Sequence, residues 1–348
     1  MSSLPEIPTS LGVAVIGAGD MGARHAQHWH SAGASVRAVC DSNVTRAEAI
    51  AKPVAAQAVA DPEALWERED VQLVSICTPT FMHAPLAVAA LQAGKHVLCE
   101  KPAALTLEDA YRMRDAAQAH GRELRIGFMR RFDPAYEQLR DFLGRMGNPV
   151  LAHATIAAGI RPKLLMHDAM ANGGPIIDMC CHIFNLWGTM FGAEVTAVSA
   201  RGYTFGSNKT ELLSITHKAL DSAHIMLEYA SGAVGQLQVS WGLPAGIAAS
   251  EYHSYMGPDG LLSVTWNSDM HFKNSLGNHH WQSSGQDPWE AQIHYFYREL
   301  CQAAPQRLAS IDDGIYALRI SLAVLEAAEQ QRLVHPEEIA PPGLQVSR

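Results

Sequence analysis

The sequence predicts an α/β protein of two domains, a doubly wound parallel sheet followed by an α+β domain with a large, mostly antiparallel sheet. Up to about residue 128, short apolar runs rich in β-branched residues alternate with amphipathic stretches of helical period. Beyond that point, longer alternating runs follow one another across short connections, which indicates antiparallel pairing. The length of 348 residues also exceeds one comfortable core and suits two domains.

In the first domain, apolar runs predict buried parallel strands at 12–16, 35–40, 56–59, 71–77, 95–100 and 124–128. The segments between them predict helices at 21–32, 44–52, 62–68, 82–93 and 106–119, each closed by Gly, Pro or a polar break. Strands and helices that alternate in this way place helices on both faces of the sheet. We therefore expect a Rossmann domain over residues 1–127.

The second domain, expected over residues 128–348, is introduced by a helix at about 133–143. Alternating runs then predict strands at 150–158, 194–205, 222–230, 233–241, 251–256 and 261–266. Ala230-Ser231-Gly232 and Gly257-Pro258-Asp259-Gly260 are hairpin-sized connections. Further helices are predicted at about 175–191, 288–303 and 312–331.

Composition excludes several classes of partner. The chain has 26 basic and 35 acidic residues, a net charge of −9, and no basic cluster longer than Arg130-Arg131, which disfavours nucleic acid and anionic membranes. The first residues form no secretory leader, and nowhere do 18 uncharged apolar residues run together. We expect a soluble, cytoplasmic protein.

Metal and disulfide chemistry are also disfavoured. The six cysteines show no C-x-x-C spacing, and Cys40, Cys77 and Cys99 fall at the ends of predicted strands, where a reduced thiol packs as a small apolar side chain. Although the chain has 17 histidines, it has no H-E-x-x-H motif and no Cys/His cluster with zinc-ligand spacing. We expect no metal and no disulfide.

A glycine-rich turn follows the first predicted strand and opens the first predicted helix. It reads Gly17-Ala18-Gly19-Asp20-Met21-Gly22. Gly17 permits the tight turn, Gly19 exposes backbone to a pyrophosphate, and Gly22 lets the helix pack on the strand. The helix N-terminus then directs N–H groups at the phosphates. Asp20 and Met21 belong to the same candidate cofactor site.

The second predicted strand ends at Asp41, 22 positions after Gly19 and near the spacing of about 20 expected for a ribose-binding acid. Its carboxylate can accept both ribose hydroxyls and repels a 2′-phosphate. NAD is therefore favoured over NADP. Arg46 lies five residues further on and could reach a phosphate, although we expect it on the solvent side of the next helix.

Ligands of a doubly wound sheet bind beyond the carboxyl ends of the strands. Two such ends carry candidate cofactor-binding residues, Thr78, Pro79 and His83 after one strand, and Glu100 and Lys101 after another. Pro102 stiffens the turn from which Lys101 projects, and we expect Lys101 to point toward the nicotinamide. A solvated loop is the alternative interpretation of this turn.

A second constellation lies in the predicted helix that Pro175 opens. Asp178 and His182 are four residues apart and are expected on one helix face, although Asp178 could instead complement the helix dipole and His182 could be a satisfied core residue. The preceding loop is unusually polar, and its candidate substrate-binding residues are Arg161, Lys163, His167 and Asp168, each of which could alternatively be a surface residue.

Taken together, these motifs resemble the glucose–fructose oxidoreductase/inositol dehydrogenase/MocA family. The shared features are the glycine turn, Thr78-Pro79 with His83, Glu100-Lys101-Pro102, the stretch 127–131, and the Gly173-Gly174-Pro175-x-x-Asp178-x-x-x-His182 pattern. The resemblance implies a catalytic triad of Lys101, Asp178 and His182. The stretch 127–131 is most similar to inositol dehydrogenases, and it adds Arg130 as a candidate substrate contact. Asn185 departs from the family, which often has an acid there.

The expected reaction oxidises a secondary hydroxyl of a sugar, cyclitol or sugar acid by hydride transfer to NAD, with Lys101 and His182 handling the proton. His182 is the first choice of acid/base because imidazole titrates near neutral pH. Lys101 could instead stabilise the alkoxide or act as the base. Asp178 would accept a hydrogen bond from a neighbouring hydroxyl or orient the other groups.

Two other functions stay open. One is an enzyme that retains NAD and epimerises or cleaves glycosides by transient oxidation; the other is a non-catalytic sugar sensor. The resemblance also implies a homodimer or homotetramer formed through the antiparallel sheet. Trp241, Tyr252 and Trp266 lie on predicted strands and could supply an apolar contact face there, or fill the core of their own domain.

Overall fold

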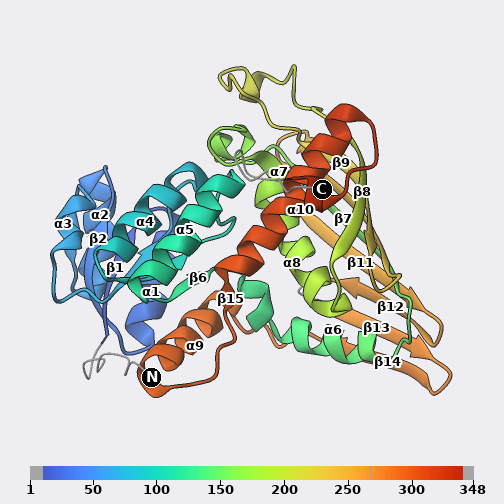
Figure 1. The fold of residues 1–348 in the computed structure, drawn as a ribbon, viewed down its shortest axis with the longest axis horizontal. Helices are drawn as coiled ribbons and strands as arrows, with labels where there is room; N and C mark the ends of the chain where they lie inside the picture. Colours follow the sequence, from blue (N-terminus) through green and yellow to red (C-terminus); the bar gives the residue numbers. More distant parts are fainter. Residues whose placement is uncertain (1–10, 267, 340–348) are drawn as a thin grey trace. The chain divides into compact units, whose positions relative to one another are not determined.

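The computed structural model describes residues 11–266 and 268–339, which form two compact units (Figure 1). The first unit contains the chain up to Ala104, Asp109–Phe132 and Asp287–Gly314. The second contains Leu105–Glu108, Asp133–Gln286 and the chain from Ile315 onward. No helix in the described ranges is both long and apolar enough to cross a membrane.

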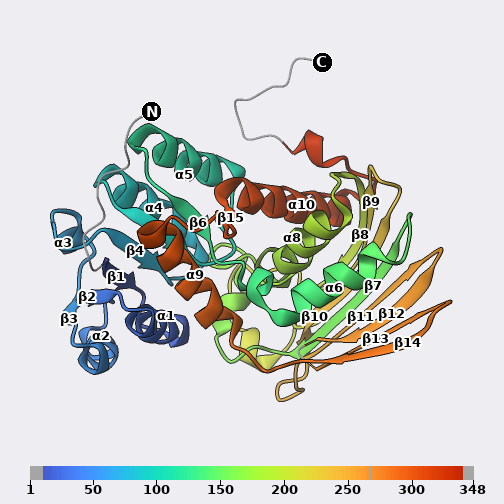
Figure 2. The same ribbon diagram turned by 90° about the horizontal axis from the view of Figure 1, so that it is seen from below.

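The first unit is built on a seven-stranded sheet of order β15-β6-β5-β4-β1-β2-β3, in which only the short β15 runs antiparallel. Its strands are β1 Gly12–Ile16, β2 Ser35–Cys40, β3 Gln57–Val59, β4 Leu73–Ile76, β5 His96–Cys99, β6 Leu124–Ile126 and β15 Ala309–Ser310. Its helices are α1 Asp20–Ser31, α2 Val44–Ala51, α3 Glu63–Trp66, α4 His83–Gln92, α5 Leu107–His120 and α9 Pro288–Gln302. Figure 2 shows α4 and α5 on one face of the sheet and α1 and α2 on the other. The predicted Rossmann fold is confirmed.

The strand order reverses between β1 and β4, and this position creates the binding edge. From β1 the chain proceeds outward through β2 and β3, then returns to β4 on the other side of β1. The backbone N–H of Gly17 donates to the carbonyl of Cys40 at 2.8 Å, and that of Cys77 donates to Ile16 at 2.7 Å. The residues that follow these strands therefore meet at one sheet edge, where doubly wound folds bind ligands.

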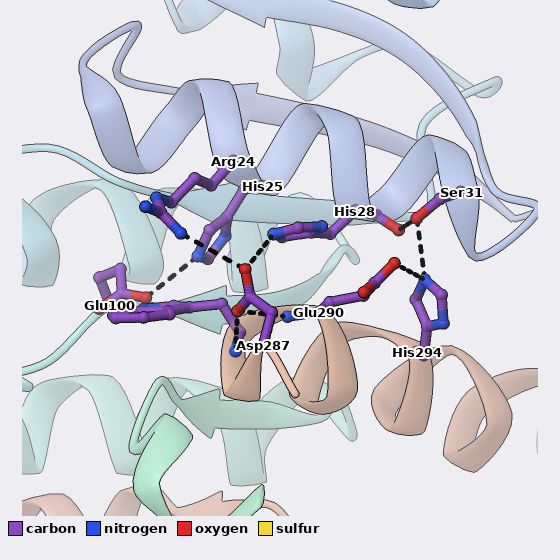
Figure 3. A network of polar contacts seen from close by, with 9 residues as sticks. Arg24, His25, His28, Ser31, Glu100, Asp287, Glu290 and His294 are labelled. Carbon is purple, nitrogen blue, oxygen red and sulfur yellow. Dashed lines mark hydrogen bonds and ion pairs between the residues drawn. The ribbon is translucent and has the colours of Figure 1, made fainter. Parts of the chain in front are cut away.

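Helix α9 belongs to the first unit, although we expected residues 128–348 to form one domain. Ile293 and Phe296 of α9 share a buried core with Trp29 of α1. Polar contacts run beside that core (Figure 3): a carboxylate oxygen of Asp287 lies 3.4 Å from the Arg24 guanidinium and 3.7 Å from the His28 ring. The helix itself is predicted by its sequence, but its partner is 250 or more residues away and leaves no local signal.

The second unit has an eight-stranded sheet of order β14-β13-β12-β11-β7-β10-β9-β8. Its strands are β7 Leu151–Gly159, β8 Val195–Tyr203, β9 Ser222–Tyr229, β10 Val234–Leu243, β11 Ser250–Gly257, β12 Gly260–Thr265, β13 Asp269–Asn274 and β14 Gly277–Gln282. Only β7 and β10 pair in parallel, and both predicted hairpins are present. The predicted mostly antiparallel sheet is confirmed.

One face of this sheet is covered by helices α6 Pro134–Gly144, α8 Cys180–Phe191 and α10 Ile311–Gln330 (Figure 1). Phe142 of α6 stacks on Phe272 of β13 with ring centroids 5.0 Å apart. Trp241 lies in the core, with 4 % of its surface exposed, whereas Tyr252 is 44 % exposed. Of the aromatic residues proposed for a contact face, Tyr252 is thus available at the surface and Trp241 is not.

Two features of this unit depart from the prediction. Neither strand of the hairpin β13–β14 is predicted from the sequence. Strand β14 is a polar edge strand with no buried residue to give an apolar alternation, whereas β13 does alternate, with Met270 and Phe272 buried. The single helix expected at 175–191 is two helices, α7 Gly174–Asp178 and α8, with a break at Met179. At this break the N–H of His182 donates to the carbonyl of Met179, three residues back, at 3.2 Å, whereas an α-helix would use the carbonyl four residues back.

His96 gives the first unit a testable dependence on pH. Burial, with smaller effects from Arg122 and Arg125, lowers its pKa to about 4, while Nδ1 accepts the N–H of Glu123 at 3.1 Å. An unfolded histidine has a pKa of about 6.5, so the neutral ring favours folding above that pH, and this stability is lost as the pH falls toward 4. Between pH 7 and 5 the loss is about 2 kcal/mol.

We expect His96→Asn, which keeps an acceptor for Glu123 but does not titrate, to lose about 2 kcal/mol less than the parent between pH 7 and 5. Urea denaturation at the two pH values measures this difference. His120→Asn, on an exposed residue of the same unit, should behave as the parent. Equal pH dependence in His96→Asn and the parent would contradict the assignment.

Candidate active site

The glycine turn after β1 forms a cradle that is closed on its protein side and open on its outer side. Gly17 has a φ of +100°, and a Cβ there would lie 2.6 Å from the carbonyl oxygen of Cys77. A Cβ on Gly22 would collide with the carbonyl oxygen of Gly17. At Gly19, by contrast, an added Cβ meets nothing within 4 Å. With α1 beginning at Asp20, this geometry fits a pyrophosphate bound at a helix N-terminus.

Asp41 is tied to that turn by hydrogen bonds. Its Oδ2 accepts the N–H of Ala18 at 2.8 Å, and its Oδ1 accepts the N–H of Asn43 at 2.8 Å. Burial raises the pKa of this carboxyl, but the donors and Arg46 outweigh burial and leave its pKa below the ordinary value. Arg46 is 58 % exposed, as expected of a solvent-side residue, yet it also pairs with Asp41 at 2.9 Å.

His83 connects the loops that follow β4 and β5. Its Nδ1 lies 2.8 Å from the carbonyl oxygen of Pro102 and its Nε2 lies 3.0 Å from that of Thr78. Burial lowers the pKa of the ring and outweighs the two carbonyls. Both ring nitrogens face backbone, so His83 acts on the candidate cofactor site by bracing its loops. The hydroxyl of Thr78 is buried and has no hydrogen-bond partner among the described residues, which leaves it for a ligand.

Glu100 and Lys101 follow β5 at the same edge. Glu100 is 6 % exposed, and its carboxylate accepts hydrogen bonds from His25 Nε2 at 3.0 Å and from the backbone N–H of Lys101 at 3.2 Å. Burial raises the pKa of Glu100, but His25 and the positive charge of Lys101 outweigh it and hold the pKa below its usual value. Glu100 therefore faces the protein interior as an anion, next to Lys101.

In the second unit, Asp178 ends α7 and His182 lies in the first turn of α8. Both are buried, at 3 % and 5 % exposure. The side-chain amide of Asn172 donates to Asp178 Oδ2 at 2.8 Å and so fixes the orientation of the carboxylate. Asn172 was not among the residues singled out from the sequence. Its position directly before Gly173-Gly174 is the signal that could have pointed to it.

The polar loop before α7 contains both buried and exposed candidate residues. His167 is 2 % exposed and accepts the N–H of Arg161 at its Nε2, 2.9 Å away, so its proton resides on Nδ1. The Arg161 guanidinium lies 5.6 Å from the centre of the Trp241 ring. Asp168 is used by the loop itself, because its Oδ1 accepts the N–H of Met170 at 2.8 Å. Lys163 is exposed at the start of the 3₁₀ helix η4, Leu164–His167.

The candidate residues thus fall into two groups, one in each unit. The first unit holds the cofactor candidates, with Lys101 and with Arg130, which is buried in the 3₁₀ helix η3, Met129–Phe132. The second unit holds Arg161, Lys163, His167, Asp168, Asp178 and His182. In the described part of the chain, no group of three or more His, Cys, Asp or Glu residues is arranged to hold a metal.

A glycine cradle at a helix N-terminus with an ionised carboxylate tied to it, placed at the switch point of a Rossmann sheet, defines a dinucleotide-binding protein. The chain belongs to the Gfo/Idh/MocA family: residues 11–128 match the oxidoreductase family with an NAD-binding Rossmann fold, and residues 137–253 match the GFO/IDH/MocA C-terminal domain. The resemblance inferred from its motifs is confirmed. The protein is an NAD-binding oxidoreductase that acts on CH–OH groups.

Similar proteins act on cyclitols and sugars. The chain is 35 % identical over 235 residues to inositol 2-dehydrogenase 4 of Saccharopolyspora erythraea, a match that spans 66 % of each chain. It is 31 % identical to inositol 2-dehydrogenase of Pseudarthrobacter chlorophenolicus, over 73 % of this chain and 74 % of the relative. Among solved structures, UDP-N-acetylglucosamine 3-dehydrogenase GnnA of Acidithiobacillus ferrooxidans has a TM-score of 0.77 and 28 % identity, and the match covers 92 % of this chain and 98 % of that one.

The Asp41–Arg46 pair generates a prediction about cofactor choice. Asp41→Ser removes the charge that repels a 2′-phosphate and releases Arg46 to bind one. We expect NADH binding to weaken about tenfold and NADPH binding to tighten about tenfold, as for a single hydrogen bond to a charged group. Fluorescence titration with each dinucleotide measures both constants.

The double variant Asp41→Ser/Arg46→Ala serves as the matched control. It should lose the part of the NADPH gain that Arg46 supplies while keeping the weaker NADH binding, because the serine is unchanged and the guanidinium is gone. An Asp41→Ser variant that binds both dinucleotides as the parent does would refute the role of Asp41 in this choice.

Proposed function

We propose that this protein is an NAD-dependent dehydrogenase that oxidises a secondary hydroxyl of a cyclitol, a sugar or a sugar acid. The observation that carries the proposal is a pair of buried polar side chains. Asp178 of α7 accepts a hydrogen bond from Asn172, and His182 of α8 follows four residues later. Buried polar side chains are costly to maintain. A carboxylate and an imidazole suit an alcohol substrate, because both can accept the protons of neighbouring hydroxyls.

Bound NAD would supply the acceptor of the substrate hydride. His182 is proposed to take the hydroxyl proton, and Lys101 to donate a hydrogen bond to the same oxygen or to share in removing the proton. Asp178 would accept a hydrogen bond from an adjacent hydroxyl. The substrate contacts proposed besides these are Arg130, Arg161, Lys163, His167 and Asp168.

The cofactor-binding residues proposed on the first unit have different roles. The turn residues Gly17, Gly19, Asp20, Met21 and Gly22 hold the pyrophosphate, and Asp41 holds the adenine ribose. Thr78 and Pro79 lie along the same sheet edge, next to Glu100 and Lys101. His83 contributes by bracing the loops, as its two carbonyl contacts support.

We also propose a homodimer or homotetramer that assembles through the sheet of the second unit. Leu151, Tyr252 and Met256 support this, since all are hydrophobic and between 44 % and 54 % exposed. They lie on the adjacent strands β7 and β11, where Tyr252 pairs with Thr155 and Met256 with Leu151. Apolar side chains that are grouped on a surface favour association.

The main test is NADH formation across inositols, aldoses and sugar acids. We expect turnover with NAD on part of this panel, and Lys101→Met and His182→Ala to lower kcat by about 10²–10⁴-fold, the usual contribution of proton transfer. Lys273→Met and His120→Ala make the same chemical changes at exposed positions and should leave kcat unchanged. NAD binding without turnover on any substrate, or full activity in both site variants, would reject the proposal.

Asn172→Ala tests how the carboxylate of Asp178 is held. The loss of one hydrogen bond to a charged group should reduce kcat about tenfold while NADH affinity stays the same, because Asn172 and the dinucleotide cradle lie in different units. Asn278→Ala, on an exposed edge strand, is the matched control. Unchanged kcat in Asn172→Ala would show that Asp178 needs no such support.

A further inference from the structure

A buried chain of hydrogen bonds runs through the first unit from α1 to the turn that carries Lys101. Trp29 Nε1 donates to Ser75 Oγ at 3.2 Å, and Ser75 Oγ lies 2.8 Å from His25 Nδ1. His25 Nε2 lies 3.0 Å from Glu100 Oε1, and the second oxygen of Glu100 accepts the N–H of Lys101 at 3.2 Å. Trp29, Ser75 and His25 are completely buried. Figure 3 shows His25 reaching from α1 to Glu100.

The direction of these bonds follows from the groups themselves. An indole N–H can only donate, so the Ser75 oxygen accepts from Trp29. The same oxygen lies 2.8 Å from His25 Nδ1, which completes the link between Trp29 and the imidazole ring. Ionised Glu100 can only accept, so the ring nitrogen that faces it, Nε2, carries a proton. That proton is donated to Glu100.

Glu100 has few alternatives to this donor. A Cβ on Gly127 would lie 2.9 Å from Glu100 Oε1, so the backbone packs closely against the carboxylate on that side. The titratable groups that interact with Glu100 are His25 from α1, His83 from α4, Lys101 from its own turn, and the thiols of Cys77 and Cys99. Only His25 and the backbone of Lys101 are seen to donate hydrogen bonds to it among the described residues.

We propose that His25 is a positioning residue of the active site, which acts through Glu100 to hold a negative charge on the residue directly before Lys101. A buried carboxylate that loses a donor is favoured in its protonated form. Without the charge on Glu100, the cationic form of Lys101 would be less favoured as well. The use of Lys101 in catalysis rests on the proposed function, whereas the chain of hydrogen bonds does not.

The test measures the amine of Lys101 directly, without any substrate. Competitive acetylation of the full-length protein with trace acetic anhydride, read by mass spectrometry of peptides, reports how much of each lysine is uncharged. We expect His25→Leu to raise the labelling of Lys101 about tenfold relative to the exposed Lys273, which corresponds to about one pKa unit. His25→Gln can donate to Glu100 and accept from Ser75, so it should label close to the parent.

Two further variants make the result decisive. His30→Gln alters an exposed histidine on the same helix and should match the parent. Glu100→Gln removes the charge while leaving His25 in place, and should raise Lys101 labelling as His25→Leu does. In the Glu100→Gln background, His25→Leu should add nothing, because both changes act through the same charge. Unchanged Lys101 labelling in Glu100→Gln overturns the proposal, even if His25→Leu fails to fold.

Activity assays separate this proposal from the proposed function. Where a substrate is turned over, His25→Leu should lower kcat about tenfold and leave NADH affinity unchanged, with His25→Gln restoring kcat. A parent that turns over no substrate but whose Lys101 labelling responds to His25→Leu would retain the role of His25 and reject the dehydrogenase. If the parent is active but its Lys101 labelling is unchanged by both His25→Leu and Glu100→Gln, the dehydrogenase is retained and the role of His25 is rejected.

Discussion

A carboxylate buried at the end of a strand has to be given hydrogen-bond donors, and much of the first unit is arranged around that requirement at Glu100. Helix α1 satisfies it with His25, while the first turn of the same helix opens from the glycine cradle. Close packing of α1 on the sheet in turn depends on Gly22, where no side chain fits. One helix therefore serves both ends of the candidate cofactor site, and its position cannot change at one end without consequence at the other.

The second unit contains the same order of groups in its own core. Trp187 Nε1 donates to the Tyr255 hydroxyl at 3.2 Å, that hydroxyl lies 3.0 Å from His253 Nδ1, and His253 Nε2 lies 2.7 Å from Glu251. Indole, hydroxyl, imidazole and carboxylate again form a line in which each donor meets an acceptor. Satisfied polar networks of this kind favour one packing arrangement over the alternatives that an apolar core would tolerate.

The sequence predicts well what is encoded locally. Strands β1 to β12 follow from apolar periodicity, and the cofactor cradle follows from three glycines between a strand and a helix. Prediction failed where the structure depends on distant partners or weak signals. His25 and Glu100 are 75 residues apart, Asn172 and Asp178 meet only because the loop folds back, and β14 has no buried side chains to mark it. The break at Met179 similarly lacks a glycine or proline within the helix to announce it.

The order of the chain has a consequence for how the protein is made. The core around Leu11 and Trp29 is completed by Ile293, Phe296 and Leu308, so the first unit is completed only after the segment Asp133–Gln286 of the second unit has been made. A ribosome releases the residues of β1 to β6 long before it releases α9. During that interval the Rossmann sheet lacks one of its covering helices, while the strands of the second unit are emerging and pairing. The apolar surface that α9 will cover is therefore exposed while every strand of the second sheet is synthesised, and the nascent chain needs protection there for longer than its N-terminal position suggests.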